Sequence, residues 1–224
     1  MLVVFEGIDK SGKATLSESV YQYLNKNSSF FYPTKFSFPE YETTSGKMVT
    51  KFLKGGYGSL QSIHYEIRSL LYASNRCPWG DKIRLALGAH GKFPKPNNVV
   101  ICDRYVTSQA HQSLDFFNDP FALEKYFRWV EELEFKDFGM PRPDLVFLID
   151  VSEEVSMSRG EAQDLQEADK EHLRKTRSIY KIMAEKEVFG ARWEVLDGTL
   201  LIEDNMLRVV RIIRDMYSSL GSIR

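Results

Sequence analysis

Residues 7–13 have the types and the spacing that bind the phosphates of a nucleotide. They read GIDKSGK, which matches the pattern Gly-x-x-x-x-Gly-Lys, and they directly follow a short apolar run. The glycines let successive backbone N–H groups turn toward a polyanion, and the N-terminus of a following helix adds positive charge. Lys13 would reach the β- and γ-phosphates as a point charge. The segment therefore predicts a phosphate-binding loop between a strand and a helix.

One position departs from this motif. Ala14 stands where the motif has a serine or threonine whose hydroxyl binds Mg²⁺. Thr15 offers a hydroxyl one residue later, but a helix turns successive side chains by about 100°. Either Mg²⁺ is held by the phosphates, waters and carboxylates, or the site is degenerate.

A second polar group follows another apolar run. Asp103 and Arg104 come directly after residues 99–102, which read VVIC. In doubly wound sheets, functional groups gather beyond the carboxyl ends of the strands. The planar guanidinium of Arg104 suits an anionic acceptor, and Asp103 would lie near a metal at the phosphate-binding loop. Taken alone this pair is weak evidence, because a surface ion pair can have the same sequence.

Short apolar runs alternate with helical patterns along the chain, which is typical of βαβ units and a parallel sheet. The apolar runs lie at 2–5, 30–36, 99–102, 145–149 and 193–196. The helical patterns cover 14–25, 43–53, 60–87, 120–137, 167–186 and 203–220. The polar segment 159–167 has almost no core-forming residues, so we expect a loop that can act as a lid.

Size and charge limit the functions open to this chain. It has 224 residues, of which 43% are hydrophobic and 27% charged, and these values predict one α/β domain over residues 1–224. The net charge of −1 disfavours a general nucleic-acid coat. No apolar run reaches the roughly 18 residues of a transmembrane helix, and residues 1–6 indicate a buried strand instead of a signal peptide. We therefore expect a cytoplasmic protein that binds neither nucleic acid nor a membrane, with Cys77 and Cys102 reduced.

Several segments spread along nearly the whole chain form a combination more specific than the phosphate-binding loop alone. They are FEGIDKSGKAT at 5–15, FPEY at 38–41, ASNR at 73–76, DRYVTSQAHQ at 103–112, PRPDL at 141–145 and TRSIY at 176–180. In this order and spacing they resemble the thymidylate kinases. The resemblance implies a P-loop NTPase fold, with a five-stranded parallel sheet, helices on both faces and a lid at about 159–167. It also implies a homodimer that uses Mg²⁺ and transfers the γ-phosphoryl of ATP to thymidylate (dTMP).

The resemblance implies roles for residues around the acceptor. Asp9 would contact the sugar 3′-hydroxyl, Tyr72 would stack on thymine, and Arg76 would hydrogen-bond the base. Arg104 would carry most of the charge on the acceptor phosphate. Gln112, favoured over His111, would disfavour a ribose 2′-hydroxyl by its bulk. The residues expected to bind dTMP are Asp9, Phe38, Tyr41, Tyr72, Arg76, Arg104, Gln112 and Glu167.

The family also divides by where it keeps its catalytic cation. One type has a basic residue in the P-loop, and the other has a small residue there and an arginine in the lid. This chain has Lys10 in the P-loop and Leu165 at the lid position, which agrees with the first type. The residues expected to act in catalysis are Lys13, Lys10, Arg104 and Asp9, with Asp9 and Asp103 near Mg²⁺. The residues expected to bind ATP are Gly7, Ile8, Asp9, Lys10, Ser11, Gly12, Lys13, Ala14, Thr15 and Arg159.

Three other functions stay open at this point. The chain could be another nucleoside or nucleotide kinase, such as a deoxynucleoside kinase. Ala14 would suit a non-catalytic nucleotide-binding module, although Lys10, Lys13, Asp9 and Arg104 are all in place. A GTPase-like switch has least support, because no NKxD-type tetrapeptide for the base occurs.

Overall fold

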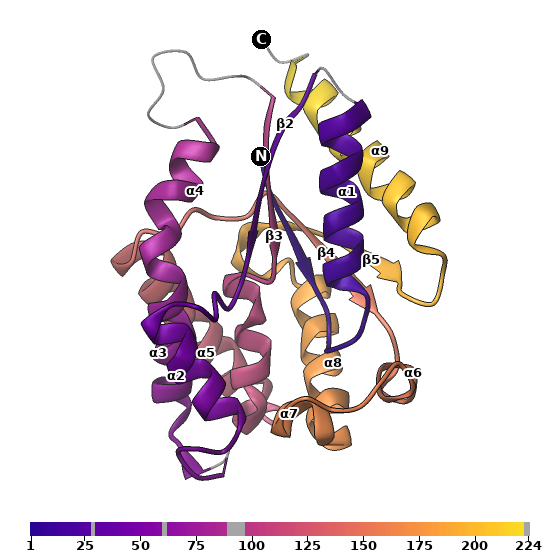
Figure 1. Ribbon diagram of the computed structural model, residues 1–224. Coiled ribbons are helices and arrows are strands. Elements are labelled where there is room, and N and C mark those ends of the chain that lie inside the picture. Colours follow the sequence, from indigo (N-terminus) through magenta and orange to yellow (C-terminus); the bar gives the residue numbers. More distant parts are fainter. Residues whose placement is uncertain (28–29, 60–61, 89–96, 222–224) are drawn as a thin grey trace.

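A five-stranded parallel sheet forms the centre of the molecule (Figure 1). The computed structural model describes residues 1–27, 30–59, 62–88 and 97–221. The strand order is β2-β3-β1-β4-β5, and each neighbouring pair runs parallel. The strands are β1 Leu2–Glu6, β2 Tyr32–Ser37, β3 Asn98–Asp103, β4 Leu145–Asp150 and β5 Arg192–Asp197. The expected fold class is thereby confirmed.

The central strands align the two polar segments that the sequence marks. Strand β1 is buried along its whole length, as the apolar run at residues 2–5 predicts for a strand covered on both faces. Its Phe5 pairs with Asp103 of β3 on one side and with Phe147 of β4 on the other. The loop after β1 and the residues after β3 therefore emerge at the same edge of the sheet.

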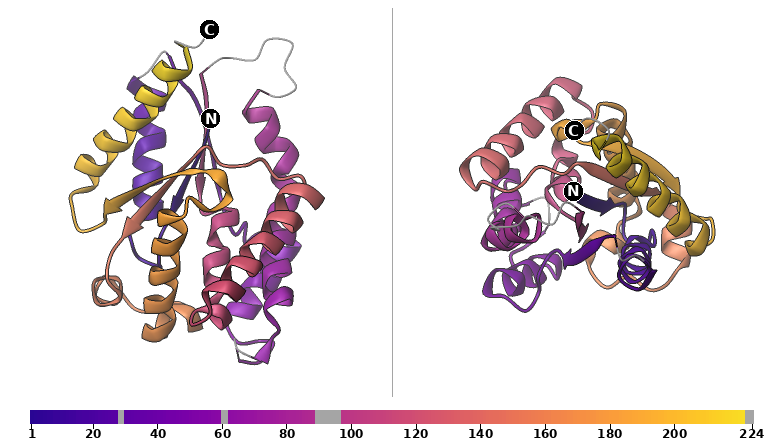
Figure 2. Two further views of the ribbon diagram at one scale, coloured as in Figure 1. Left: turned by 180° about the vertical axis from the view of Figure 1, so that it is seen from behind. Right: turned by 90° about the horizontal axis from the view of Figure 1, so that it is seen from above.

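Helices cover both faces of this sheet, as the views in Figures 1 and 2 agree. On one face α1 (Lys13–Asn27) and α9 (Ile202–Gly221) pack side by side over a cluster that includes Val3, Phe5 and Phe147. On the other face α5 (Pro120–Glu131) and α8 (Lys170–Glu185) contribute to a cluster that includes Val4 and Leu148. Alternate residues of β1 thus pack into two hydrophobic clusters, one on each face of the sheet.

The remaining helical elements connect the strands and flank the sheet. They are α2 Thr44–Leu53, α3 Tyr65–Arg76, α4 Gly80–Ala86, α6 Glu153–Ser158, α7 Leu165–Ala168, and the 3₁₀ helices η2 Cys77–Trp79, η3 Val106–Gln112, η4 Leu114–Phe116 and η6 Val188–Gly190. Helices α2 and α3 pack against each other through Phe52 and Tyr72. Among the described helices, none has both the length and the apolar character needed to cross a bilayer.

Three predicted helices are divided in the structure. The pattern at 60–87 contains α3, η2 and α4, because Pro78 lacks an N–H group and interrupts the helix; residues 60 and 61 lie outside the described residues. The pattern at 120–137 begins as α5 and ends as the π-helix η5, Glu132–Asp137. The pattern at 167–186 breaks at Asp169, whose carboxylate accepts from the N–H groups of Glu171 and His172 and so starts α8.

Candidate active site

The loop after β1 has the backbone shape that the phosphate-binding motif requires. Gly7 has a φ of 150°, and a Cβ there would lie 2.6 Å from the carbonyl oxygen of Ile149, so only glycine fits. Lys10 and Gly12 also have positive φ values, of 55° and 99°. Helix α1 begins directly after this loop, at Lys13. The N-terminus of α1 therefore faces the space that the loop encloses.

Lys13 is buried beneath the loop. Its Nζ donates to the carbonyl of Ile8 at 3.2 Å and lies 3.8 Å from Oδ1 of Asp9. Burial and the nearby Arg104 lower the pKa of Lys13, and Asp9 opposes this shift. The lysine is thus a desolvated cation whose charge gains a partner when phosphate binds.

Arg104 joins the two polar segments through charge. Its Nη2 forms an ion pair with Oδ1 of Asp9, and its own N–H donates to the carbonyl of Phe5 at 3.0 Å. Burial alone would raise the pKa of Asp9, but Arg104 and Lys13 hold this pKa well below its usual range. The carboxylate of Asp9 is therefore ionised and already occupied by cations of the protein.

Two buried histidines extend this arrangement. Nη1 of Arg104 lies 3.0 Å from Nε2 of His111, and Nδ1 of His111 lies 3.4 Å from Nε2 of His172. A guanidinium can only donate, so Nε2 of His111 accepts and its Nδ1 carries the proton that His172 receives. Burial, with Arg104 adding to it, puts the pKa of His111 well below its ordinary value. Both rings are neutral near pH 7, and the contact between His111 and Arg104 restrains the guanidinium.

These side chains border one cavity. Every residue expected to bind the acceptor lies around it. The lining residues are Asp9, Phe38, Pro39, Tyr41, Leu53, Tyr72, Arg76, Arg104, Ser108, His111, Gln112, Asp164, Gln166 and Glu167. Both candidates for the 2′-hydroxyl position, His111 and Gln112, are in this set, so the geometry leaves that choice open. Oε1 of Gln112 is buried and has no hydrogen-bond partner within the described ranges.

One wall of the cavity, at Arg76, rests on a buried polar network that the sequence did not reveal. Arg76 is 2% exposed and Glu134 of η5 is 0% exposed. Nε of Arg76 donates to Oε2 of Glu134 at 3.0 Å, and Nη2 of Arg76 contacts Oε1 of the same carboxylate. Gln109 donates to that Oε1 at 2.9 Å. Arg76 therefore lines the cavity while a carboxylate holds it from behind.

Another buried carboxylate fixes the segment after Arg104. Oε1 of Glu6 accepts from the backbone N–H of Tyr105 at 3.0 Å, and from the hydroxyls of Thr107 and Ser108. Its Oε2 accepts from the hydroxyl of Tyr180 at 2.7 Å. The signal that could have found Glu6 was a charged residue at the end of a buried strand, which needs such partners.

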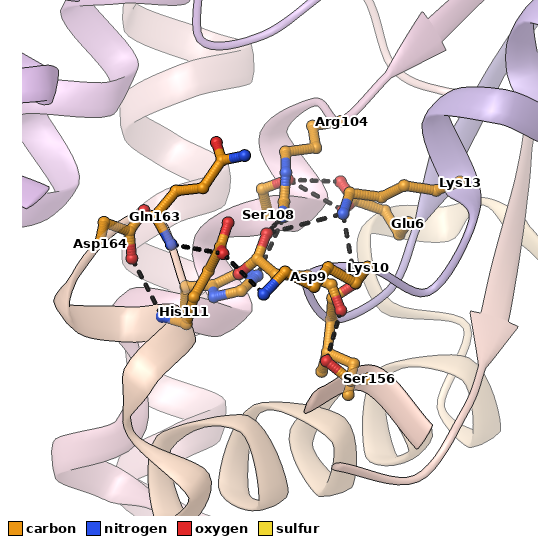
Figure 3. A network of polar contacts seen from close by, with 12 residues as sticks. Glu6, Asp9, Lys10, Lys13, Arg104, Ser108, His111, Ser156, Gln163 and Asp164 are labelled. Atoms are coloured by element: carbon orange, nitrogen blue, oxygen red, sulfur yellow. Dashed lines mark hydrogen bonds and ion pairs between the residues drawn. The ribbon is translucent and has the colours of Figure 1, made fainter. Parts of the chain in front are cut away.

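Two cations link the lid to the P-loop. Figure 3 shows one of them, Lys10, on the side of the lid residues Gln163 and Asp164. Nζ of Lys10 donates to the carbonyls of Gly160 and Glu161 at 3.0 and 2.7 Å, and it lies 3.2 Å from Oε2 of Glu167. The other cation is Arg159, whose Nη1 donates to the carbonyls of Lys10 and Ser11 and whose Nη2 donates to that of Gly198. Arg159 therefore supports the backbone of the P-loop, and its expected contact with ATP stays a prediction.

The comparisons with known proteins agree with this geometry. The family model for thymidylate kinase matches residues 5–209. A thymidylate kinase of Mycobacterium tuberculosis (strain ATCC 25618 / H37Rv) is 30% identical over 206 residues, which cover 88% of this chain and 91% of the relative. The chain belongs to the thymidylate kinase family. As a member it is an ATP-dependent nucleoside monophosphate kinase.

Further relatives support the same assignment. A thymidylate kinase of Plasmodium falciparum (isolate 3D7) is 29% identical, with 90% of this chain and 84% of the relative covered. A solved structure of thymidylate kinase from Candida albicans superposes with a TM-score of 0.70 at 20% identity, covering 96% of this chain and 91% of that one. This superposition shows the shared fold.

Kinases of this kind use Mg²⁺ with ATP, and the residues present fit such an ion. Oδ1 of Asp103 is buried and has no hydrogen-bond partner among the residues described. Asp9, the other predicted ligand, is occupied by Arg104 and Lys13. Mg²⁺ in phosphoryl-transfer sites takes one or two carboxylates together with substrate phosphates. Asp103 is therefore better placed than Asp9 to bind Mg²⁺. Because Ala14 has no hydroxyl group, more of the ligands of the ion would come from the nucleotide phosphates.

Proposed function

We propose that this chain transfers the γ-phosphoryl of ATP to dTMP, giving dTDP and ADP, as a step in the supply of dTTP. One observation carries the assignment of the acceptor. A single cavity is lined by Arg104, which lies beside the P-loop, and by the aromatic ring of Tyr72 and the guanidinium of Arg76. These three groups match the phosphate, the ring and the polar edge of a pyrimidine nucleotide.

The donor side supplies positioning and positive charge. The P-loop N–H groups, the N-terminus of α1 and Lys13 would bind the β- and γ-phosphates of ATP. A phosphate oxygen of dTMP attacks the γ-phosphorus as the bond from that phosphorus to the β,γ-bridging oxygen breaks, and ADP leaves. Lys10 would stabilise the transferring group. No general base is required, because the acceptor phosphate is ionised at neutral pH.

The acceptor side fixes the direction of attack. Asp9 would orient the sugar 3′-hydroxyl while holding Arg104 against the acceptor phosphate. Tyr41 borders the same cavity and can add one hydrogen bond without charge. The lid residues Asp164 and Glu167 complete the wall, so lid closure would keep water from competing as the nucleophile.

Asp103 would hold Mg²⁺ together with the nucleotide phosphates. The ion neutralises charge on the phosphates during transfer. The buried Oδ1 of Asp103, which has no hydrogen-bond partner among the described residues, supports this proposal. Asp9 contributes mainly through Arg104.

The active unit is proposed to be a homodimer. Ile67 and Leu70 are 59% and 37% exposed on α3. They are three residues apart and so share one face of the helix. A second copy of the chain would cover this apolar face. Light scattering should give twice the mass of one chain, and Ile67→Asp should halve it. The control is Phe121→Asp, at a phenylalanine that is 81% exposed on α5; an unchanged mass in Ile67→Asp would contradict the proposed interface.

A coupled assay with ATP and a panel of monophosphates tests the proposed reaction. We expect dTMP to give the highest kcat/KM. Deoxyuridylate lacks one methyl group, worth about 1–3 kcal/mol, so its kcat/KM should be roughly 10–200-fold lower. EDTA should abolish activity, and added Mg²⁺ should restore it. A preference for adenylate or guanylate would overturn the acceptor assignment, and no activity with any monophosphate would favour a non-catalytic module.

A further inference from the structure

Glu134 is a carboxylate placed where the helix pattern calls for an apolar side chain. It lies on the buried face of the continuous helix α5–η5, one turn beyond Val130, and is 0% exposed. Burying an ionised carboxylate is costly unless it is fully paired. Pairing is provided by Arg76 and Gln109 alone among the side chains described. A buried ion pair seldom stabilises a folded protein more than a well-packed apolar pair does. Stability alone therefore does not explain why this ion pair lies next to the cavity.

The pair controls which nitrogen of Arg76 can meet a ligand. Nε and Nη2 are committed to Glu134. The hydrogen bonds that the Arg76 side chain makes with the described residues are these two, so Nη1 is left for a ligand. Arg76 lines the cavity that Tyr72 also borders. The carboxylate therefore fixes the plane of the guanidinium and leaves one edge for the base.

Gln109 restrains the carboxylate in turn. Its amide nitrogen donates to Oε1 of Glu134 at 2.9 Å and to the carbonyl of Ser69 at 3.2 Å. Its Oε1 accepts from the hydroxyl of Tyr126 at 3.1 Å. Every contact in this network is buried, so Arg76 is held in one orientation with or without a nucleotide.

We propose that Glu134 is a positioning residue that makes Arg76 selective for the base of the acceptor. This inference rests on the proposed function, in which Arg76 faces thymine. A guanidinium has only donors. When Glu134 holds the guanidinium so that Nη1 faces the base, Nη1 can donate to a carbonyl oxygen of that base. If the base has an amino group at the same position, two donors face each other and no hydrogen bond forms. Glu134 therefore disfavours cytosine nucleotides and leaves uracil and thymine nucleotides acceptable.

The first test compares two glutamates on the same helix. Glu134→Gln keeps the volume and one acceptor but removes the charge, so Arg76 loses its fixed plane. Glu131 pairs with Arg142 at 2.7 Å on the surface, and Glu131→Gln is the matched control. We expect Glu134→Gln to raise the KM for dTMP about tenfold and to cut the ratio of kcat/KM for dTMP over dCMP about tenfold. The KM for ATP should change less than twofold, and Glu131→Gln should behave as wild type.

A double variant separates positioning from a general structural role. If Glu134 acts through Arg76, the dTMP-to-dCMP ratio of Arg76→Met with Glu134→Gln should equal that of Arg76→Met alone. Glu134→Asp keeps the charge but moves the carboxylate away from Arg76 by one methylene group. The dTMP-to-dCMP ratio of this variant tests the inference if Glu134→Gln does not fold. Unchanged selectivity in a folded Glu134→Gln or Glu134→Asp, or additive losses in the double variant, would overturn the inference. A wild-type enzyme inactive on dTMP would instead remove the proposed function and this inference with it.

Discussion

Two charged pairs at the proposed site are held in different ways. The first is Arg76 with Glu134, which are 2% and 0% exposed and joined by two hydrogen bonds. The second is Lys10 with Glu167, whose side chains are 18% and 14% exposed, and Lys10 also donates to two lid carbonyls. The first pair links a helix to a helix within the core, whereas the second links the P-loop to the lid across the site.

This difference separates recognition from chemistry. The Arg76–Glu134 pair can stay intact when a nucleotide binds, because Nη1 of Arg76 is not used by Glu134. Lys10 has an acidic partner in the lid, Glu167, that the phosphates of a nucleotide would replace. Asp9 would keep its ion pair with Arg104. Binding beside the P-loop therefore exchanges an ion pair, so Glu167 of the lid and the nucleotide compete for Lys10.

The largest expected effect is at Lys10. A cation that contacts the transferring group mainly in the transition state affects kcat more than binding. Phosphate-stabilising arginines contribute about 10³–10⁵ in rate, and a lysine lacks their bidentate fork. Lys10→Ala should therefore lower kcat by up to about 10³-fold and change the KM for ATP much less, as steady-state kinetics would measure.

Arg159, at the hinge of the lid, is the matched cation for this experiment, because among the described residues its guanidinium donates to the backbone carbonyls of Lys10, Ser11 and Gly198. Arg159→Ala should loosen the loop and mainly raise the KM for ATP. A collapse of kcat in Arg159→Ala, with Lys10→Ala near wild type, would place the catalytic charge in the lid hinge and reverse this assignment.

A smaller effect is expected from the buried histidine behind Arg104. Burial lowers the pKa of His172 from 6.5 to about 4. Between pH 6.5 and pH 4, His172 is protonated in the unfolded chain but neutral in the folded protein. The free energy of unfolding therefore falls as the pH falls from 6.5 to 4. The loss is about 1.4 kcal/mol per pH unit for one such histidine.

His172→Gln isolates this contribution, because its amide oxygen can still accept from His111 while the side chain no longer titrates. Urea unfolding of both proteins at pH 7, 6, 5 and 4 should give a shallower decline for the variant. Parallel declines in the two proteins would mean that His172 has an ordinary pKa in the folded state.

Short motifs in the sequence predicted the P-loop and the position of Arg104. They did not predict contacts between residues that lie far apart in the sequence. The P-loop and Arg104 could be found because each lies in a short segment whose spacing defines its backbone shape. Glu134 pairs with a residue 58 positions earlier, and no local pattern names that partner. A signal did exist: Leu123, Phe127 and Val130 form an apolar stripe that continues onto Glu134, and an acid in such a stripe needs a buried cation.

The role of Arg159 shows the same limit from the other side. Its position at the lid hinge was readable from the sequence, but its contacts depend on how α6 approaches the P-loop. Ser156 of the same helix donates to the carbonyl of Asp9 at 2.7 Å, which brings the hinge behind the loop. The sequence therefore predicted where Arg159 lies but not its contacts with the backbone of the P-loop.

The smallest expected effect is at Leu165, the lid position that holds an arginine in the other type of the family. Leu165 is 44% exposed, and its methyl group approaches Gly55 in the loop after α2. This apolar contact brings the lid to the acceptor side but offers no charge to the transferring group. Leu165→Ala should therefore change both kcat and the KM for ATP less than about threefold, since only a half-exposed side chain is lost. Leu165→Met is the control that keeps the contact. A drop in kcat of tenfold or more in Leu165→Ala alone would show that lid closure through Leu165, and not the cation at Lys10, limits turnover.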